Sequence, residues 1–184
     1  MNYDSAVRRA MGVVMLVLAG CGSAASTAHL ATAQPSPTPK PYPVSYTSTS
    51  GHFSANFPSA PTESTTPASI SGYHLEIIYA ASRDASGAVE VGEEDIQPAL
   101  PSDQFQSAMN SALQNFSISS GLANTSQPSA TTFDNTPGLK GTFAGRGINM
   151  TGLGFFLADG TRMYLLFAPS AEFGSLTSSF KIVG

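Results

Sequence analysis

The sequence has little cysteine, little charge and few histidines, and these shortages limit the kinds of fold and function that it can have. A single cysteine in 184 residues excludes an intramolecular disulfide framework, so the fold must depend on packing and hydrogen bonds. Charged residues make up 11% of the chain, against roughly 25% in typical soluble domains. Acidic residues (12) outnumber Lys and Arg (8), and no basic stripe carries interleaved aromatics, which argues against a nucleic-acid partner.

Motifs for catalysis and for cofactor binding are also missing. The chain has no Gly-x-Ser-x-Gly elbow, and beyond residue 46 its histidines are His52 and His74, both in strand-like segments. A serine nucleophile needs a positioned base, which this pattern does not specify. The glycines from Gly138 to Gly154 form neither Gly-x-Gly-x-x-Gly nor a phosphate loop. The sequence therefore predicts no catalytic residue and no cofactor.

What the chain does contain begins with an export leader, residues 1–20. Arg8 and Arg9 precede an uncharged apolar run over residues 10–18. That run has the length of a signal-peptide core and is short for a membrane span. An uncleaved anchor is the alternative interpretation.

The leader ends in the motif Leu18-Ala19-Gly20-Cys21. This motif resembles the lipobox of bacterial lipoproteins, and the resemblance implies cleavage before Cys21 and diacylglycerol on its thiol. Two or more acyl chains hold a protein firmly on a bilayer, so the membrane is an expected partner. The resemblance also implies an extracytoplasmic protein on the cell membrane. Because Gly22 rather than Asp follows Cys21, it implies the outer membrane if the source has two. An ordinary secretory leader with an unrelated cysteine is the alternative.

Residues 21–46 show no periodic apolar pattern and are predicted to be a tether. Residues 22–33 are small and polar, and residues 34–43 carry proline at every other position. Proline fixes φ and favours extended neighbours, so the ten residues of this second half should reach roughly 31 Å at about 3.1 Å each. We expect a spacer that holds a single domain, residues 47–184, away from the membrane. A ligand for a proline-recognition domain is the alternative.

Within that domain, alternating apolar residues predict strands and a 3.6-residue period predicts helices. The expected strands are residues 51–58, 73–79, 88–91, 130–133, 138–145, 150–158 and 162–168. Asp159-Gly160 predicts a tight hairpin. One apolar helical stripe runs from Phe105 to Phe116, with Ser102 as its N-cap and Gly121 beyond its end. Phe173, Leu176 and Phe180 mark a second helix. The fold class is therefore α+β, an antiparallel sheet packed by an internal and a C-terminal helix.

Three short motifs span the domain: Gly51-x-Phe53-Ser54-x-x-Phe57-Pro58-x-x-Pro61, then Pro137-Gly138-x-x-Gly141-x-Phe143, then Phe173 followed by Ser179-Phe180-Lys181. They resemble the opening strand, the glycine strand and the last helix of PsbP-like domains, which occur in many bacterial surface proteins. The resemblance covers residues 51–183 and implies a layered fold. It implies no activity, because the photosynthetic members assist an oxygen-evolving centre and no residue pattern here carries that role over.

One constellation offers metal-binding chemistry, namely His74, Glu76 and Glu94. If Tyr79 pairs with Val89 in a hairpin, Glu94 stands opposite His74 on the polar face, and carboxylate plus imidazole can hold a divalent ion. The acidic residues have a simpler explanation as a solvated strand end that prevents pairing with a neighbouring chain.

Gly152 and Gly154 flatten one face of a strand, where a helix could pack closely or an apolar ligand could enter. Phe155 and Phe156, which follow, must point to opposite faces. Three functions remain open. The first is a non-catalytic surface module that binds an envelope protein or polymer, the second is a carrier or sensor of a small apolar ligand, and the third is a metal-dependent enzyme.

Overall fold

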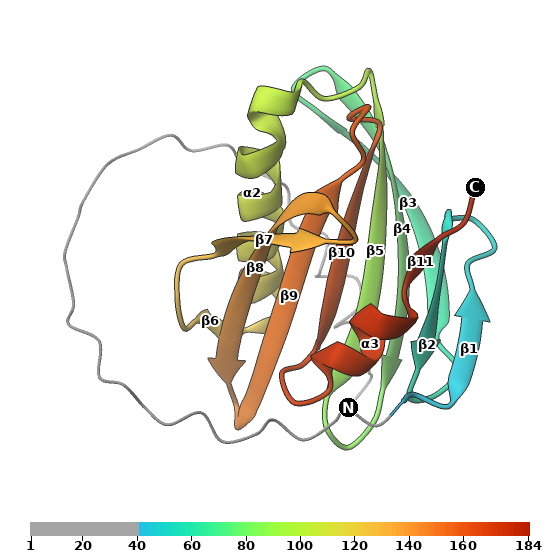
Figure 1. Ribbon diagram of the computed structural model, residues 1–184. Helices are drawn as coiled ribbons and strands as arrows, with labels where there is room; N and C mark the ends of the chain where they lie inside the picture. The colour runs from blue at the N-terminus through green and yellow to red at the C-terminus, as the bar shows by residue number, and fades with distance from the viewer. Residues whose placement is uncertain (1–40) are drawn as a thin grey trace.

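The computed structural model describes residues 41–184 as an α+β fold (Figure 1). The leader, Cys21 and most of the tether lie outside the described residues. The elements are β1 (Val44–Thr47), β2 (Phe53–Phe57), β3 (Thr62–Ile70), β4 (Tyr73–Arg83), β5 (Ala88–Gln97), η1 (Ser102–Gln104), α2 (Phe105–Ser120), β6 (Ala123–Asn124), β7 (Ser129–Phe133), β8 (Thr136–Gly145), β9 (Ile148–Phe156), β10 (Arg162–Pro169), α3 (Phe173–Ser179) and β11 (Lys181–Ile182). In this part of the chain, neither α2 nor α3 is long and apolar enough to cross a membrane.

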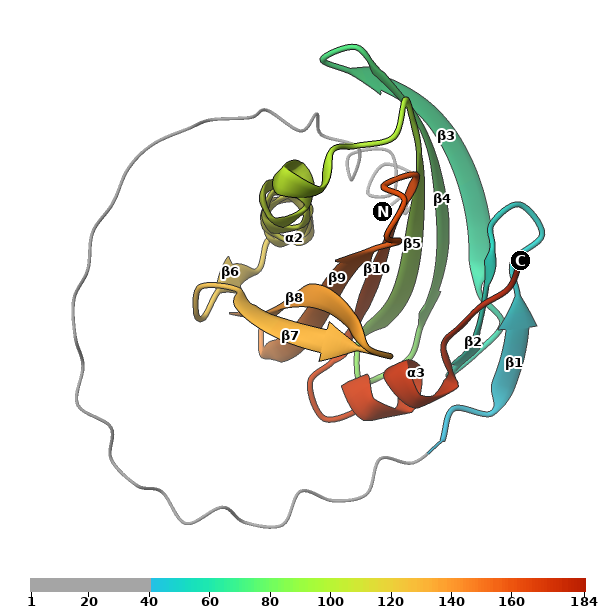
Figure 2. The same cartoon turned by 45° about the horizontal axis from the view of Figure 1, so that its top comes forward.

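The large sheet has eight antiparallel strands, and its order is not the order of the chain. It runs β3-β4-β5-β10-β9-β8-β6, with β7 pairing to β8 as well. Strand β10 therefore lies between β5 and β9, and it joins the first half of the domain to the second. Figure 2 shows that this sheet is strongly curved.

Three layers result, with the large sheet in the middle. Helix α2 covers one face, while α3 and the small sheet β1-β2-β11 cover the other (Figures 1 and 2). The two faces have separate cores. The core under α3 includes Phe53, Phe57, Tyr164, Leu176 and Phe180. The core under α2 includes Met109, Leu113, Phe143, Phe156 and Phe167.

Helix α2 confirms the predicted stripe. Its aromatic residues stack on the sheet, Phe105 on Phe156 at 4.3 Å between ring centroids and Phe116 on Phe167 at 3.7 Å. Gly121 ends the helix with φ 68°, as expected of a glycine there. The N-cap prediction was wrong, because Ser102 begins the 3-10 turn η1 and makes no side-chain cap bond.

The glycine pair serves packing. A Cβ on Gly154 would lie 3.5 Å from Met109 of α2, and one on Gly152 would lie 2.5 Å from the Phe167 ring. Helix and ring fill the space that these glycines leave, which agrees with the expected close packing of a helix rather than with the alternative of ligand entry. The opposite orientation of the next two residues is confirmed, since Phe155 belongs to the core under α3 and Phe156 to the core under α2.

The fold begins earlier than residue 47 and contains strands that the sequence did not predict, among them β1 and β3. Strand β1 pairs with β2 from Val44 onward, and Tyr42 is buried in the core under α3. The end of the expected tether is therefore part of the folded domain. Strand β3 was missed because its sequence is small, polar and interrupted by Pro67, features that suit the edge of a sheet.

Candidate functional site

The register of the β4–β5 hairpin separates the predicted metal ligands. Tyr79 pairs with Gly92 rather than with Val89, which places Glu94 opposite Ile77 and His74 opposite Gln97. The difference is three residues, and an odd shift moves a side chain to the other face of the sheet. Glu94 therefore lies on the α2 face, while His74 and Glu76 lie on the α3 face. The assumed trio does not form.

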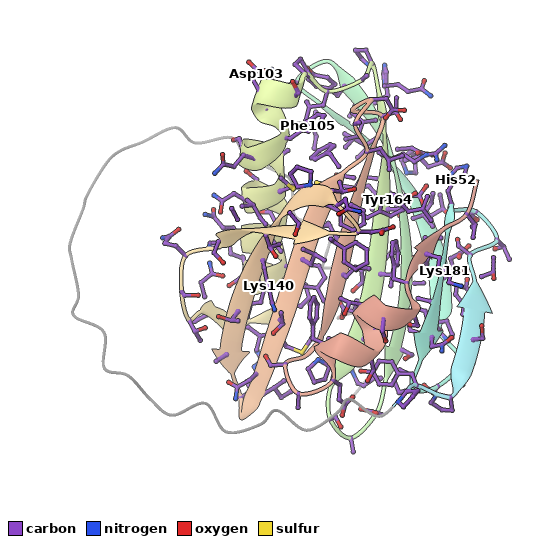
Figure 3. All side chains as sticks on the ribbon, viewed as in Figure 1. His52, Asp103, Phe105, Lys140, Tyr164 and Lys181 are labelled. Carbon is purple, nitrogen blue, oxygen red and sulfur yellow. The ribbon has the colours of Figure 1, made fainter. Side chains whose placement is uncertain are left out.

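A different cluster forms where β2 crosses the large sheet. Glu93, in the middle of β5, is fully buried. Its Oε2 accepts the backbone N–H of His52 at 2.6 Å, and its Oε1 lies 2.7 Å from the Nδ1 of the same residue. Asp95 follows on the same face of β5 and accepts a hydrogen bond from Nε of Arg162 at 2.8 Å. His52 lies close to Tyr164 in this region (Figure 3).

His52, Glu93 and Asp95 offer three ligand atoms within 4.8 Å of one another, a spacing that a metal ion could bridge. The guanidinium of Arg162 already forms ion pairs with both carboxylates, its Nε lying 2.8 Å from Asp95 and 3.9 Å from Glu93. A cation would have to displace this fixed positive charge from both acids. The residues therefore fit an ion-pair network better than a metal centre.

The same cluster lacks the parts of a hydrolytic site. The hydroxyl of Tyr164 donates to the carbonyl oxygen of His52 at 3.3 Å, and burial raises the pKa of Tyr164 well above its ordinary value. The phenol is thus a neutral donor with a structural partner. No serine, threonine or cysteine hydroxyl or thiol of the described chain hydrogen-bonds the ring of His52. The arrangement fixes the β2 strand on the sheet.

A second carboxylate, Glu63 on β3, fastens the turn between β1 and β2. It accepts hydrogen bonds from Tyr46, from Ser48 at 2.6 Å, and from both the backbone and the hydroxyl of Thr49. Burial works to raise the pKa of Glu63, but these hydrogen bonds outweigh it and lower the pKa to about 2. The carboxylate is therefore charged and saturated with donors, and it has no free capacity for a ligand.

Two further carboxylates face α2. Burial among apolar neighbours raises the pKa of Glu94 to about 7, and no hydrogen bond to this side chain is present in the described structure. Burial also raises the pKa of Glu90, although a hydrogen bond from Tyr79 and the charge of Arg83 oppose the increase. These groups lie on β5 without a nucleophile or a histidine on their face of the hairpin.

The described surface is hollowed on both sides of α3. The larger groove, of about 490 Å³, lies between α3 and strands β7 and β8. Its lining residues are Thr131, Thr132, Phe133, Lys140, Thr151, Leu153, Ser170, Ala171, Phe173, Gly174, Thr177 and Ser178. The smaller groove, of about 330 Å³, lies between α3 and β2 and is lined by Pro41, Ser45, Ser54, Ala55, Asn56, Ser175, Ser178, Ser179 and Lys181.

These α3 grooves share a composition that sequence reasoning did not single out. Each contains one lysine, most of the other polar groups are hydroxyls, and no acidic side chain lines either groove. Figure 3 shows Lys140 and Lys181 on opposite sides of α3. Serine and threonine are so frequent in this chain that their convergence could not be recognised before the fold was known.

Comparison of the chain with protein-family models found no match. A search of curated proteins likewise found no relative of significant sequence similarity.

Proposed function

We propose that this chain is an extracytoplasmic lipoprotein whose domain is a non-catalytic binding module for an envelope protein or polymer. In this proposal Cys21 carries the lipid, and the proline-rich segment that follows spaces the domain from the bilayer. The layered domain is proposed to be of the PsbP-like type, in agreement with its central antiparallel sheet covered by a helix on each face.

The observation that carries the proposal is the separation of reactive side chains from the hollowed surface. His52, Glu93 and Asp95 are held by internal partners, and Glu63 is saturated by the β1–β2 turn. The α3 grooves, by contrast, are open and polar, and they contain no acid–base pair. A surface with this chemistry can hold a partner but offers no means of activating a nucleophile.

The position of the smaller groove fits a tethered module. Pro41, where the described chain begins, lines this groove, so the tether enters the domain beside the proposed binding surface. A partner bound there would lie within tether reach of the membrane. The apolar-carrier alternative has less support, because Met109 and Phe167 fill the space beside the glycine pair that it would use.

Fractionation of cells tests the anchor. Cys21→Ser should move the protein from the membrane pellet to the soluble extracytoplasmic fraction, because a serine hydroxyl cannot form the thioether. Ser23→Ala, two residues later, is the matched control and should leave the protein in the pellet. Unchanged pelleting of the Cys21→Ser protein with a normally processed leader would contradict the proposed anchor.

Photo-crosslinking in intact cells tests the binding surface. A photoreactive residue at Ser178, which is exposed and lines both α3 grooves, should crosslink to an envelope component. The same residue at Gln114, exposed on α2, is the control and should give little product. Equal crosslinking at the two positions, or none at either, would contradict the proposed binding face.

A further inference from the structure

The charges of the domain are unevenly distributed around α3. Residues 1–40 hold one of the 12 acidic and three of the 8 basic residues, so eleven acidic side chains face five basic ones in residues 41–184. Despite this excess, the lining of the α3 grooves contains two lysines and no carboxylate. Glu172, just before α3, accepts a hydrogen bond from Tyr42 at 2.9 Å. The grooves therefore carry positive charge on an acidic domain.

Both lysines are available to a ligand. Within residues 41–184, no carboxylate lies within ion-pair distance of Lys140 or Lys181. The ammonium of Lys140 lies 5.3 Å from the centroid of the Phe173 ring, and this cation–π contact holds it at the wall of the larger groove. An ammonium held in place without a counter-ion attracts a carboxylate or a phosphate.

The remaining polar groups of the larger groove are suited to a hydroxylated ligand. Thr177 and Ser178 donate their hydroxyl protons to carbonyl oxygens of α3, which leaves their oxygens as acceptors. The hydroxyls of Thr131 and Thr132 have no partner in the described part of the chain and can donate or accept. Mixed donors and acceptors of this kind match the hydroxyl groups of a sugar or a polyol.

The two grooves are neighbours at α3, because Ser178 lines both of them. A chain lying across the exposed side of α3 would meet Lys140 at one end and Lys181 at the other (Figure 3). Such a path suits an extended polymer better than a compact ligand. Two lysines are few for a nucleic acid, whose binding depends on neutralising many phosphates.

From these features we infer that the α3 grooves bind an anionic polyhydroxylated polymer, a sugar or polyol chain that carries carboxylate or phosphate groups. This inference rests on the proposed function and names the chemical class of its partner. The lysines pair with the acidic groups, while the threonine and serine hydroxyls hydrogen-bond to the hydroxyls of the chain.

Calorimetric titration of the full mature chain in detergent tests the inference with defined probes. The probes are hexagalacturonate for carboxylates, a six-unit poly(glycerol phosphate) for phosphates, neutral galactohexaose, and hexaglutamate for charge without hydroxyls. At least one of the two acidic hydroxylated probes should bind at least about tenfold more tightly than galactohexaose and hexaglutamate, and added salt should weaken its binding. Whichever of the two binds more tightly identifies the acidic group.

Lysine variants locate the binding. Lys140→Gln and Lys181→Gln should each weaken binding of the acidic hydroxylated probe at least about fivefold, and together by more, because each removes one charge-assisted contact. Arg83→Gln is the matched control, because it removes an exposed cation at the end of β4 that lines neither groove. An unchanged melting temperature in all four variants, the double variant included, shows that the loss of binding is not a loss of folding.

Three outcomes would overturn the inference. They are equal binding of the neutral and acidic hydroxylated probes, unchanged binding by the lysine variants, and no binding of either acidic hydroxylated probe. The last result combined with crosslinking at Ser178 in cells would overturn the polymer class alone and leave the proposed function standing. No probe binding and no crosslinking would overturn both.

Discussion

Glu93 holds His52 at two points, its Oε2 accepting the backbone N–H at 2.6 Å and its Oε1 lying 2.7 Å from the ring Nδ1. Glu93 is fully buried, so this pair fixes the start of β2 on the large sheet from within. The two residues are 41 positions apart in the sequence, so the contact joins distant parts of the chain.

Glu93→Gln should lower the free energy of unfolding by about 1–3 kcal/mol, because an amide NH₂ group would face a donor where a carboxylate oxygen now accepts. Urea denaturation monitored by circular dichroism measures the change. Glu76→Gln, an exposed substitution on the neighbouring strand, is the control and should change stability by less than about 0.5 kcal/mol. Equal losses in the two variants would show that the buried contact adds nothing.

Glu63 should stabilise the protein in a pH-dependent manner. Its hydrogen bonds lower the pKa of the carboxyl to about 2 from an ordinary 4.5, so its stabilising contribution is complete above pH 4.5 and is lost as the pH falls toward 2. After allowance for partial exposure, Glu63→Gln should lower the free energy of unfolding at pH 7 by about 2 kcal/mol. Denaturation curves of both proteins from pH 7 to pH 2 should converge at the acid end, and a constant difference would contradict this account.

Glu94 should have the opposite effect on the pH dependence of stability, because its ionised form opposes folding. Burial raises its pKa to about 7, so the folded protein retains the proton between pH 4.5 and pH 7 while the unfolded chain loses it. The ionised form therefore opposes folding above pH 7. Glu94→Gln should raise the free energy of unfolding at pH 8 by on the order of 1–3 kcal/mol and leave it unchanged at pH 4. Thermal melts at both pH values provide the measurement, and a destabilised variant at pH 8 would refute the prediction.

Gly152→Ala should destabilise the core under α2. The added Cβ would lie 2.5 Å from the Phe167 ring and 3.0 Å from Phe143, and neither ring is free to move in a packed interior. Overpacking of this kind costs about 1–3 kcal/mol, which exceeds the usual gain of replacing glycine within a strand. Gly92→Ala is the control, because its Cβ would have its nearest contact at 3.6 Å. Similar stability of the two variants would argue against close packing at Gly152.

Much of the fold followed from local sequence patterns. The apolar stripe from Phe105 to Phe116 predicted α2 because one face of that helix packs on the sheet. Asp159-Gly160 predicted the β9–β10 hairpin, where Gly160 adopts a φ of 72°. Strand β3 escaped prediction because an edge strand needs little apolar surface and tolerates Pro67.

Local sequence patterns could not predict the candidate sites, because their residues meet through the tertiary fold. His52 and Glu93 meet only because β2 folds across β5, and no periodicity in the sequence encodes that crossing. The metal prediction for Glu94 depended on one hairpin register, and the four-residue turn from Asp84 to Gly87 sets a different one. Lys181 follows α3 closely in the sequence, but Lys140 reaches the other side of that helix only through the tertiary fold.

The place of β10 between β5 and β9 has a consequence for how the chain assembles. Arg162 and Asp95, which meet across β10 and β5, are 67 residues apart, so closing this seam requires nearly the whole domain to be present. Until β10 enters, β5 and β9 each present an unpaired edge that can capture another chain. Pairing of β10 with β5 and β9 thus joins the two halves of the sheet into one cooperative unit, and it removes both aggregation-prone edges at the same step.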